Sequence, residues 1–158
     1  MFMVEKDWKH LSTQQMGRFA EYLVKMKLTF HSLDIYSPEI DDRGIDFVIR
    51  TQAGNFLEIQ VKAVRSLTYF YIQKSKMEIR PARYVAFCDF TNPEPKLYLI
   101  PSSAWASPNK LFKDRNYEGK SSAPEWGLDL RENNMHLLEP YKFDDIVMKL
   151  PFCSEQPA

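Results

Sequence analysis

Apolar positions in the first part of the chain change from a helical period to an alternating one. Ser12 and Gln15 have the spacing of a capping box, and apolar residues follow them at helical intervals. We therefore predict a helix over residues 13–28. Two stretches of strictly alternating apolar residues then predict strands at 45–49 and 57–61, joined by a hairpin loop.

The rest of the chain predicts further strands and two short helices. Aromatic and β-branched runs indicate strands near residues 67–72, 84–90, 96–100 and 126–130. Short helices are expected at 102–105 and 143–150. Residues 107–124 are polar and carry Pro, Gly and Ser, which is typical of a long surface excursion. We expect one domain over residues 8–150, with tails at 1–7 and 151–158.

Composition narrows the class of protein. The chain has 158 residues, 44% of them hydrophobic, which is enough for one compact core. Its 21 Lys and Arg balance 21 Asp and Glu, which excludes the strongly basic histone-like and ribosomal classes. Two distant cysteines and no apolar run of membrane length indicate a protein of the reducing cytoplasm, without a membrane partner. Nothing in the chain calls for an organic cofactor.

The two alternating strands carry polar residues on the face away from the core. Asp46 lies on the first strand, and Glu58, Gln60 and Lys62 lie on the second. A hairpin loop at 51–55 would place Asp46 opposite Gln60 and diagonal to Lys62, unless a β-bulge shifts the register. A carboxylate, an amide oxygen and an ammonium group together suit metal-assisted phosphodiester hydrolysis. An ordinary Asp46–Lys62 ion pair on an exposed strand face is the alternative.

Three segments of the chain resemble the successive motifs of the PD-(D/E)XK nuclease superfamily. They read Gly17-Arg-Phe-Ala-Glu21-Tyr-Leu-Val, Asp42-Arg-Gly-Ile-Asp46-Phe-Val and Glu58-Ile-Gln-Val-Lys62-Ala. The likeness covers about residues 12–105 and is greatest to bacterial branches whose last motif reads Gln-x-Lys. It implies a restriction-endonuclease-like α/β fold, with a mixed central sheet of about five strands flanked by helices. Its core order is helix, three-stranded meander, helix, strand.

The resemblance assigns roles to individual residues. Asp46 corresponds to the metal-binding aspartate, Gln60 to the acidic residue of the signature, Lys62 to the catalytic lysine and Glu21 to the helix glutamate. These four are the expected catalytic residues. Asp46, Gln60 and Glu21 are also the expected ligands of Mg²⁺, for which Mn²⁺ can substitute, with Glu58 acting through water. Gln60 is neutral where the family has a carboxylate, so we expect weak metal binding.

Nucleic acid is the expected partner. From Lys62 to Arg83 the chain holds six basic residues and one acidic residue, with tyrosines between them. The expected DNA contacts are Arg65, Tyr69, Tyr71, Lys74, Lys76 and Arg80. We therefore interpret the chain as a Mg²⁺-dependent DNA endonuclease. The alternative is a catalytically inactive nuclease-fold protein that binds nucleic acid or a protein partner, and a homodimer is a further expectation.

Overall fold

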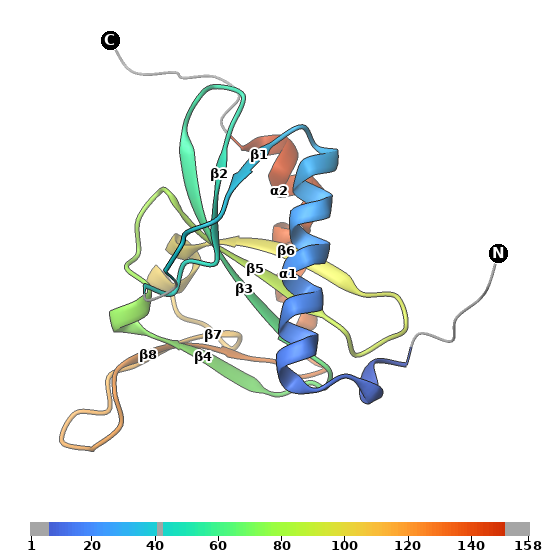
Figure 1. Ribbon diagram of the computed structural model, residues 1–158. Coiled ribbons are helices and arrows are strands. Elements are labelled where there is room, and N and C mark those ends of the chain that lie inside the picture. The colour runs from blue at the N-terminus through green and yellow to red at the C-terminus, as the bar shows by residue number, and fades with distance from the viewer. Residues whose placement is uncertain (1–6, 41–42, 151–158) are drawn as a thin grey trace, which may run out of the picture.

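The computed structural model describes residues 7–40 and 43–150, which form two sheets and their flanking helices (Figure 1). The strands are β1 (Asp34–Tyr36), β2 (Phe47–Arg50), β3 (Phe56–Val64), β4 (Tyr69–Gln73), β5 (Arg83–Asp89), β6 (Lys96–Pro101), β7 (Phe112–Arg115) and β8 (Glu125–Asp129). The helices are α1 (Thr13–Phe30) and α2 (Phe143–Lys149), and 3₁₀ turns lie at Trp8–His10, Lys74–Lys76, Ser102–Ala106 and Met135–Tyr141. The predicted tails at 1–7 and 151–158 lie outside the described residues except for Asp7, and the boundary at 8–150 stays a prediction.

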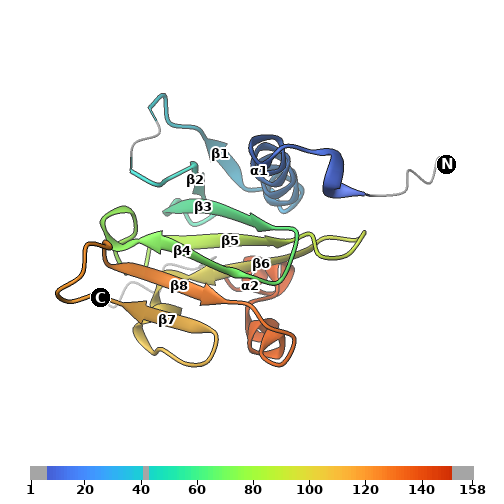
Figure 2. The same cartoon turned by 90° about the horizontal axis from the view of Figure 1, so that it is seen from below.

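The central sheet has five strands in the order β1-β2-β3-β5-β6, and the second sheet has three in the order β4-β8-β7. The β3–β5 pair is parallel and the other pairs in the central sheet are antiparallel. Helices α1 and α2 cover one face of the central sheet, and the second sheet covers the other (Figure 2). This confirms the predicted α/β fold with a mixed five-stranded sheet.

Helix α1 begins as its capping box predicts. The Gln15 side chain accepts a hydrogen bond from Ser12 N at 2.9 Å, and the Ser12 hydroxyl accepts one from Gln15 N at 3.1 Å. Four buried residues spaced one turn apart pack the helix onto the sheet: Met16, Ala20, Val24 and Leu28. The helix ends two residues beyond the predicted boundary.

The β2–β3 hairpin has the predicted register as far as the first residue of β2. Val48 pairs with Glu58 and Phe47 pairs with Ile59. Asp46 does not continue the ladder to Gln60, because its backbone N donates to the carbonyl of Ile59 at 2.9 Å. Two residues of one strand therefore lie opposite one residue of the other, which is the arrangement of a β-bulge.

The predicted strand at 67–72 is present as β4, and it pairs with β8 in the second sheet and not with the central strands. The meander of the central sheet begins instead with β1, which is too short to show an alternating pattern. One prediction about the core is wrong. The helix expected between the meander and its parallel strand is replaced by β4 and a single 3₁₀ turn at Lys74–Lys76.

The polar stretch at 107–124 is not purely a surface excursion. It contains β7, whose Phe112 is 2% exposed, and the preceding Leu111 is fully buried. Both pack between the two sheets. These two buried residues hold the segment against the core, but two residues are too few to show a periodic pattern in the sequence. Within residues 7–40 and 43–150, no helix is both long and apolar enough to cross a membrane.

Candidate active site

The candidate site lies where β3 extends past the first residue of β2. Beyond Ile59, β3 continues beside β5 as far as Val64. The Asp46 carboxylate accepts a hydrogen bond from Val61 N at 2.5 Å at this step in the sheet. Because the N–H and C=O of one strand residue point to the same side, the Val61 carbonyl faces the same edge. The bulge thus gives Asp46 a fixed position beside two backbone polar groups.

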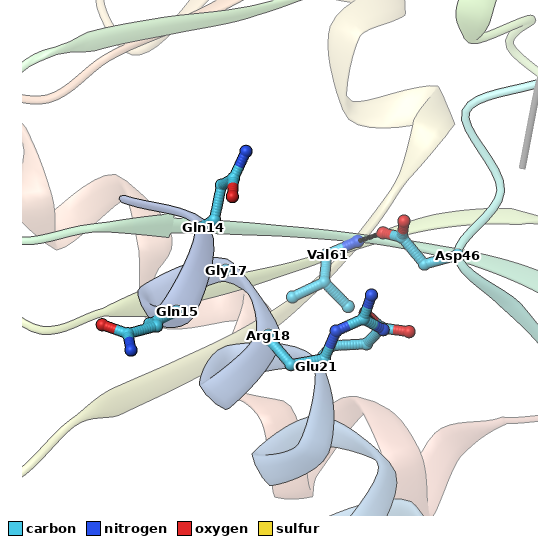
Figure 3. Close-up of a pocket in the computed structure, with 7 residues that line it drawn as sticks. All are labelled: Gln14, Gln15, Gly17, Arg18, Glu21, Asp46 and Val61. Carbon is cyan, nitrogen blue, oxygen red and sulfur yellow. Dashed lines mark hydrogen bonds and ion pairs between the residues drawn. The ribbon is translucent and has the colours of Figure 1, made fainter. Parts of the chain in front are cut away.

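Asp46 and Glu21 line one open pocket of roughly 540 Å³. The pocket lies between the N-terminal half of α1 and the edge of β3, as Figure 3 shows. Its lining residues are Gln14, Gln15, Gly17, Arg18, Glu21, Asp46 and Val61. A Cβ added at Gly17 would meet no atom within 4 Å, so the missing side chain leaves this approach open. Glu21 lies one turn after Gly17, on the side of α1 that lines this pocket.

Glu21 is already paired with two cations. Its carboxylate accepts from Arg18 at 3.0 Å and lies 3.2 Å from the Lys25 ammonium, and the side chain is 15% exposed. Each partner comes from the same helix, three or four residues away, as is usual for helical ion pairs. Arg18 and Lys25 would therefore compete with a metal for Glu21.

Gln60 and Lys62 lie on the face of β3 opposite Val61. Gln60 is 8% exposed, and its side-chain oxygen accepts from Arg83 at 3.4 Å. Lys62 is partly exposed and pairs in register with Phe87 of β5. Among the described residues it has neither a hydrogen bond nor an ion pair, so its charge is available to a ligand. The structure thus places Asp46 and Glu21 in one pocket, with the Gln-x-Lys pair on the adjoining strand.

Glu58 is paired with two arginines. It was expected to reach a metal through water, but its carboxylate binds the guanidinium groups of Arg80 and Arg83, the latter at 3.2 Å. Arg83 is 2% exposed, and burial lowers the pKa of its guanidinium. Two cations therefore neutralise Glu58 on the same face as Gln60.

Arg83 is a site residue whose role the sequence motifs do not predict. Besides Glu58 and Gln60, it donates to the carbonyls of Gly44 and Lys76, both at 2.7 Å. Gly44 has a φ of +68°, and a Cβ there would lie 2.8 Å from the Lys76 carbonyl. Arg83 thereby fixes the turn that leads into Asp46. The available signal was an arginine directly preceding the apolar run of β5.

The oxygen donors of this region are of the kind that Mg²⁺ prefers, and metal binding here stays a prediction. Asp46 supplies a carboxylate, Gln60 an amide oxygen and Val61 a backbone carbonyl, all hard ligands of the kind Mg²⁺ prefers. Residues 7–40 and 43–150 contain no group of three His, Cys, Asp or Glu side chains arranged to hold a metal. One carboxylate with neutral oxygens would leave several positions of the ion to water.

The predicted DNA contacts divide into packed and exposed residues. Arg65 donates to the Trp8 and Leu11 carbonyls, at 3.1 and 2.7 Å, and so fastens the segment before α1. Lys74 contacts Asp114 and lies over an aromatic ring of β8, and Arg80 binds the Glu58 carboxylate.

The other three predicted DNA contacts lie on or next to β4. The Tyr69 hydroxyl donates to the buried Glu125 at 2.5 Å, and burial raises the pKa of Tyr69. Tyr71 is 51% exposed and stacks beside Tyr69, with ring centroids 6.4 Å apart. Lys76 is exposed. Tyr71 and Lys76 are therefore the members of the predicted set that are most open to a ligand, and DNA binding by the set stays a prediction.

Comparison with known proteins supports the fold. No family model matches the chain, and no curated protein matches it. A solved structure titled as a bacterial homing endonuclease, I-Ssp6803I, is similar with a TM-score of 0.53 and 15% identity. The likeness covers 87% of this chain and 93% of that chain. At this identity the likeness shows a shared fold, and membership of the PD-(D/E)XK superfamily stays an interpretation of the motifs.

Proposed function

We propose that the protein is a Mg²⁺-dependent endonuclease that hydrolyses phosphodiester bonds of DNA. One observation carries this proposal: Asp46 and Glu21 line the same pocket. The pocket lies at the edge of β3, the strand that also holds Gln60 and Lys62. The order of these residues along the chain is that of the nuclease motifs they resemble. The fold shared with a homing endonuclease supports the same reaction and the same substrate class.

Asp46, Gln60 and the Val61 carbonyl would hold the ion. When bound, Mg²⁺ supplies an activated water and stabilises the negative charge of the transition state. The Lys62 ammonium group stabilises developing charge on the phosphate, or the neutral amine of Lys62 accepts the proton of the attacking water. The ammonium group suits the first role because it has no ion pair among the described residues. Glu21 lies across the pocket from Asp46. It can position a water molecule there once its ion pairs with Arg18 and Lys25 are broken.

A binding protein on the same fold is the second candidate. Its support is that Glu21 and Glu58 are both neutralised by arginine or lysine, and that Gln60 carries no charge. Under this proposal the face holds nucleic acid or a protein partner without cutting it. The two candidates differ in whether the protein cleaves DNA when a divalent ion is present.

Incubation with supercoiled plasmid and short branched DNA, in Mg²⁺, Mn²⁺ or EDTA, tests the nuclease proposal. We expect metal-dependent cleavage that Asp46→Asn abolishes, since the amide keeps an acceptor for Val61 N but removes the charge. Asp34→Asn, at an exposed aspartate of β1, is the matched control and should cleave normally. DNA binding without cleavage in any metal would leave the binding protein, and absence of both would refute the nuclease and leave only a protein partner for the second candidate.

A further inference from the structure

Helix α1 presents a second apolar stripe on the side away from the sheet. Phe19, Tyr22, Met26 and Phe30 are 40%, 61%, 65% and 85% exposed. On a helix of about 100° per residue they fall within an arc of about 80°. The helix lies on the outside of the central sheet (Figure 2), and Phe19, the least exposed of the four, also packs against Trp8 and Phe90. Grouped exposed apolar residues of this size mark interaction surfaces.

The stripe has the spacing of a helix that packs against another helix. Its intervals of three, four and four residues are close to a heptad pattern. The spacing is nearly the same when read from either end. In an antiparallel pair of α1 helices, Phe19 of one copy meets Phe30 of the other, and Tyr22 meets Met26. A self-complementary surface of this kind fits a two-fold symmetric interface.

Charges beside the stripe favour a second copy over an acidic partner. Arg18 and Lys25 are paired with Glu21 on the same helix, and Lys27 lies 3.2 Å from Asp144. These cations are thus locally neutralised and attract an acidic partner only weakly. The same neutralisation removes most of the repulsion between two identical helices.

We propose that two copies of this chain associate through the α1 stripe, with their helices antiparallel. At roughly 200 Å² for each full side chain, the exposed fractions leave about 500 Å² per copy and about 1,000 Å² for the pair. That area is the lower limit for a specific interface, so we expect a weak dimer with a dissociation constant of roughly 1–100 µM. The proposal goes beyond the proposed function and does not depend on it.

The interface leaves the candidate active site accessible. Glu21 and Gly17 lie on a different side of α1, with Glu21 about 145° from the centre of the stripe. A partner helix on the stripe therefore does not fill the pocket shared by Glu21 and Asp46. Association can be measured with no DNA or metal present, so its failure and a failure of the nuclease proposal are distinguishable.

Sedimentation velocity from 1 to 200 µM tests the association. We expect the weight-average mass to rise from monomer to dimer, and Met26→Lys to weaken association at least about tenfold. Met148→Lys is the matched control because Met148 is also helical and is 64% exposed, against 65% for Met26. A monomer throughout the range, or equal effects of the two variants, would overturn the proposal. Circular dichroism checks that both variants remain folded.

Cross-linking with a short bismaleimide tests the orientation. In a Cys153→Ser background, the antiparallel pair predicts cross-linked dimers from Phe19→Cys/Phe30→Cys and none from Phe30→Cys alone. Cys88 is buried, so it does not react in the folded protein. Cross-linking by Phe30→Cys alone would show a parallel pair, and no cross-linking by either variant would contradict contact through the stripe.

Discussion

The buried arginine behind the site should contribute far more to stability than its exposed neighbour. Replacing Arg83 with Met keeps similar volume but removes the donors to the Gly44 and Lys76 carbonyls. Each buried carbonyl left without a donor costs about 1–3 kcal/mol. Release of the buried charge offsets part of this loss, and Glu58 keeps its bond to Arg80. We therefore expect Arg83→Met to lower the free energy of unfolding by about 2–4 kcal/mol.

Arg80→Met is the matched control for this experiment. Arg80 binds the same carboxylate of Glu58, but its side chain is 41% exposed, so its loss should cost less than about 1 kcal/mol. Urea unfolding followed by circular dichroism measures both, and Arg83→Met should lower the midpoint by about 1–2 M. Equal midpoints for the two variants would refute the role of Arg83 as the residue that joins the Asp46 turn to β3 and β5.

Gly127→Ala should destabilise the second sheet by about 1–3 kcal/mol, because the added Cβ would lie 2.1 Å from the Tyr69 hydroxyl. Gly17→Ala has open space and should raise helix stability by about 0.5–1 kcal/mol; thermal unfolding measures both, and equal signs would contradict these contacts. A hydrogen bond from His31 lowers the pKa of the Asp144 carboxyl, so its stabilisation is present above about pH 4 and lost as the pH falls below that. Asp144→Asn should therefore cost up to about 1 kcal/mol at pH 7 and progressively less as the pH falls below about 4, and a deficit that does not shrink on acidification would exclude this explanation.

The pattern of apolar and polar residues predicted those helices and strands whose formation depends on neighbouring residues. The Ser12 capping box fixed the start of α1, and the alternation of Leu57, Ile59 and Val61 predicted β3. The β2–β3 register followed from the length of one loop. Each of these features depends on residues close in sequence, which is why a single chain was enough to predict them.

Features that depend on contacts between distant segments could not be predicted from the local sequence pattern. β4 is rich in aromatic residues and would suit either sheet, and its pairing with β8 depends on residues more than 50 positions away. Phe19 is one of the apolar residues that follow Gln15 at helical intervals, yet it is 40% exposed and packs against Trp8 and Phe90. Helical spacing alone cannot distinguish a core face from a face that packs on a neighbouring segment.

The sequence motifs predicted which residues form the candidate site, but they did not predict the contacts that hold these residues in place. Asp46 and Glu21 do meet, but through a bulge that turns Asp46 toward Val61 instead of Gln60. The ion pairs of Glu58 and the four bonds of Arg83 could not be read from the chain, because they join segments up to 39 residues apart. Whether Glu21, Asp46, Gln60 and Lys62 carry out catalysis stays a prediction.

The most direct test of the nuclease account separates cleavage from binding at two lysines. With Mg²⁺ and saturating DNA, Lys62→Ala should slow single-turnover cleavage by on the order of 10²–10³-fold and leave the Kd for DNA nearly unchanged. Lys76→Ala, at an exposed lysine of the predicted DNA surface, should weaken binding and lower its salt dependence but cleave normally once saturated. Cleavage by Lys62→Ala at the wild-type rate would contradict the account.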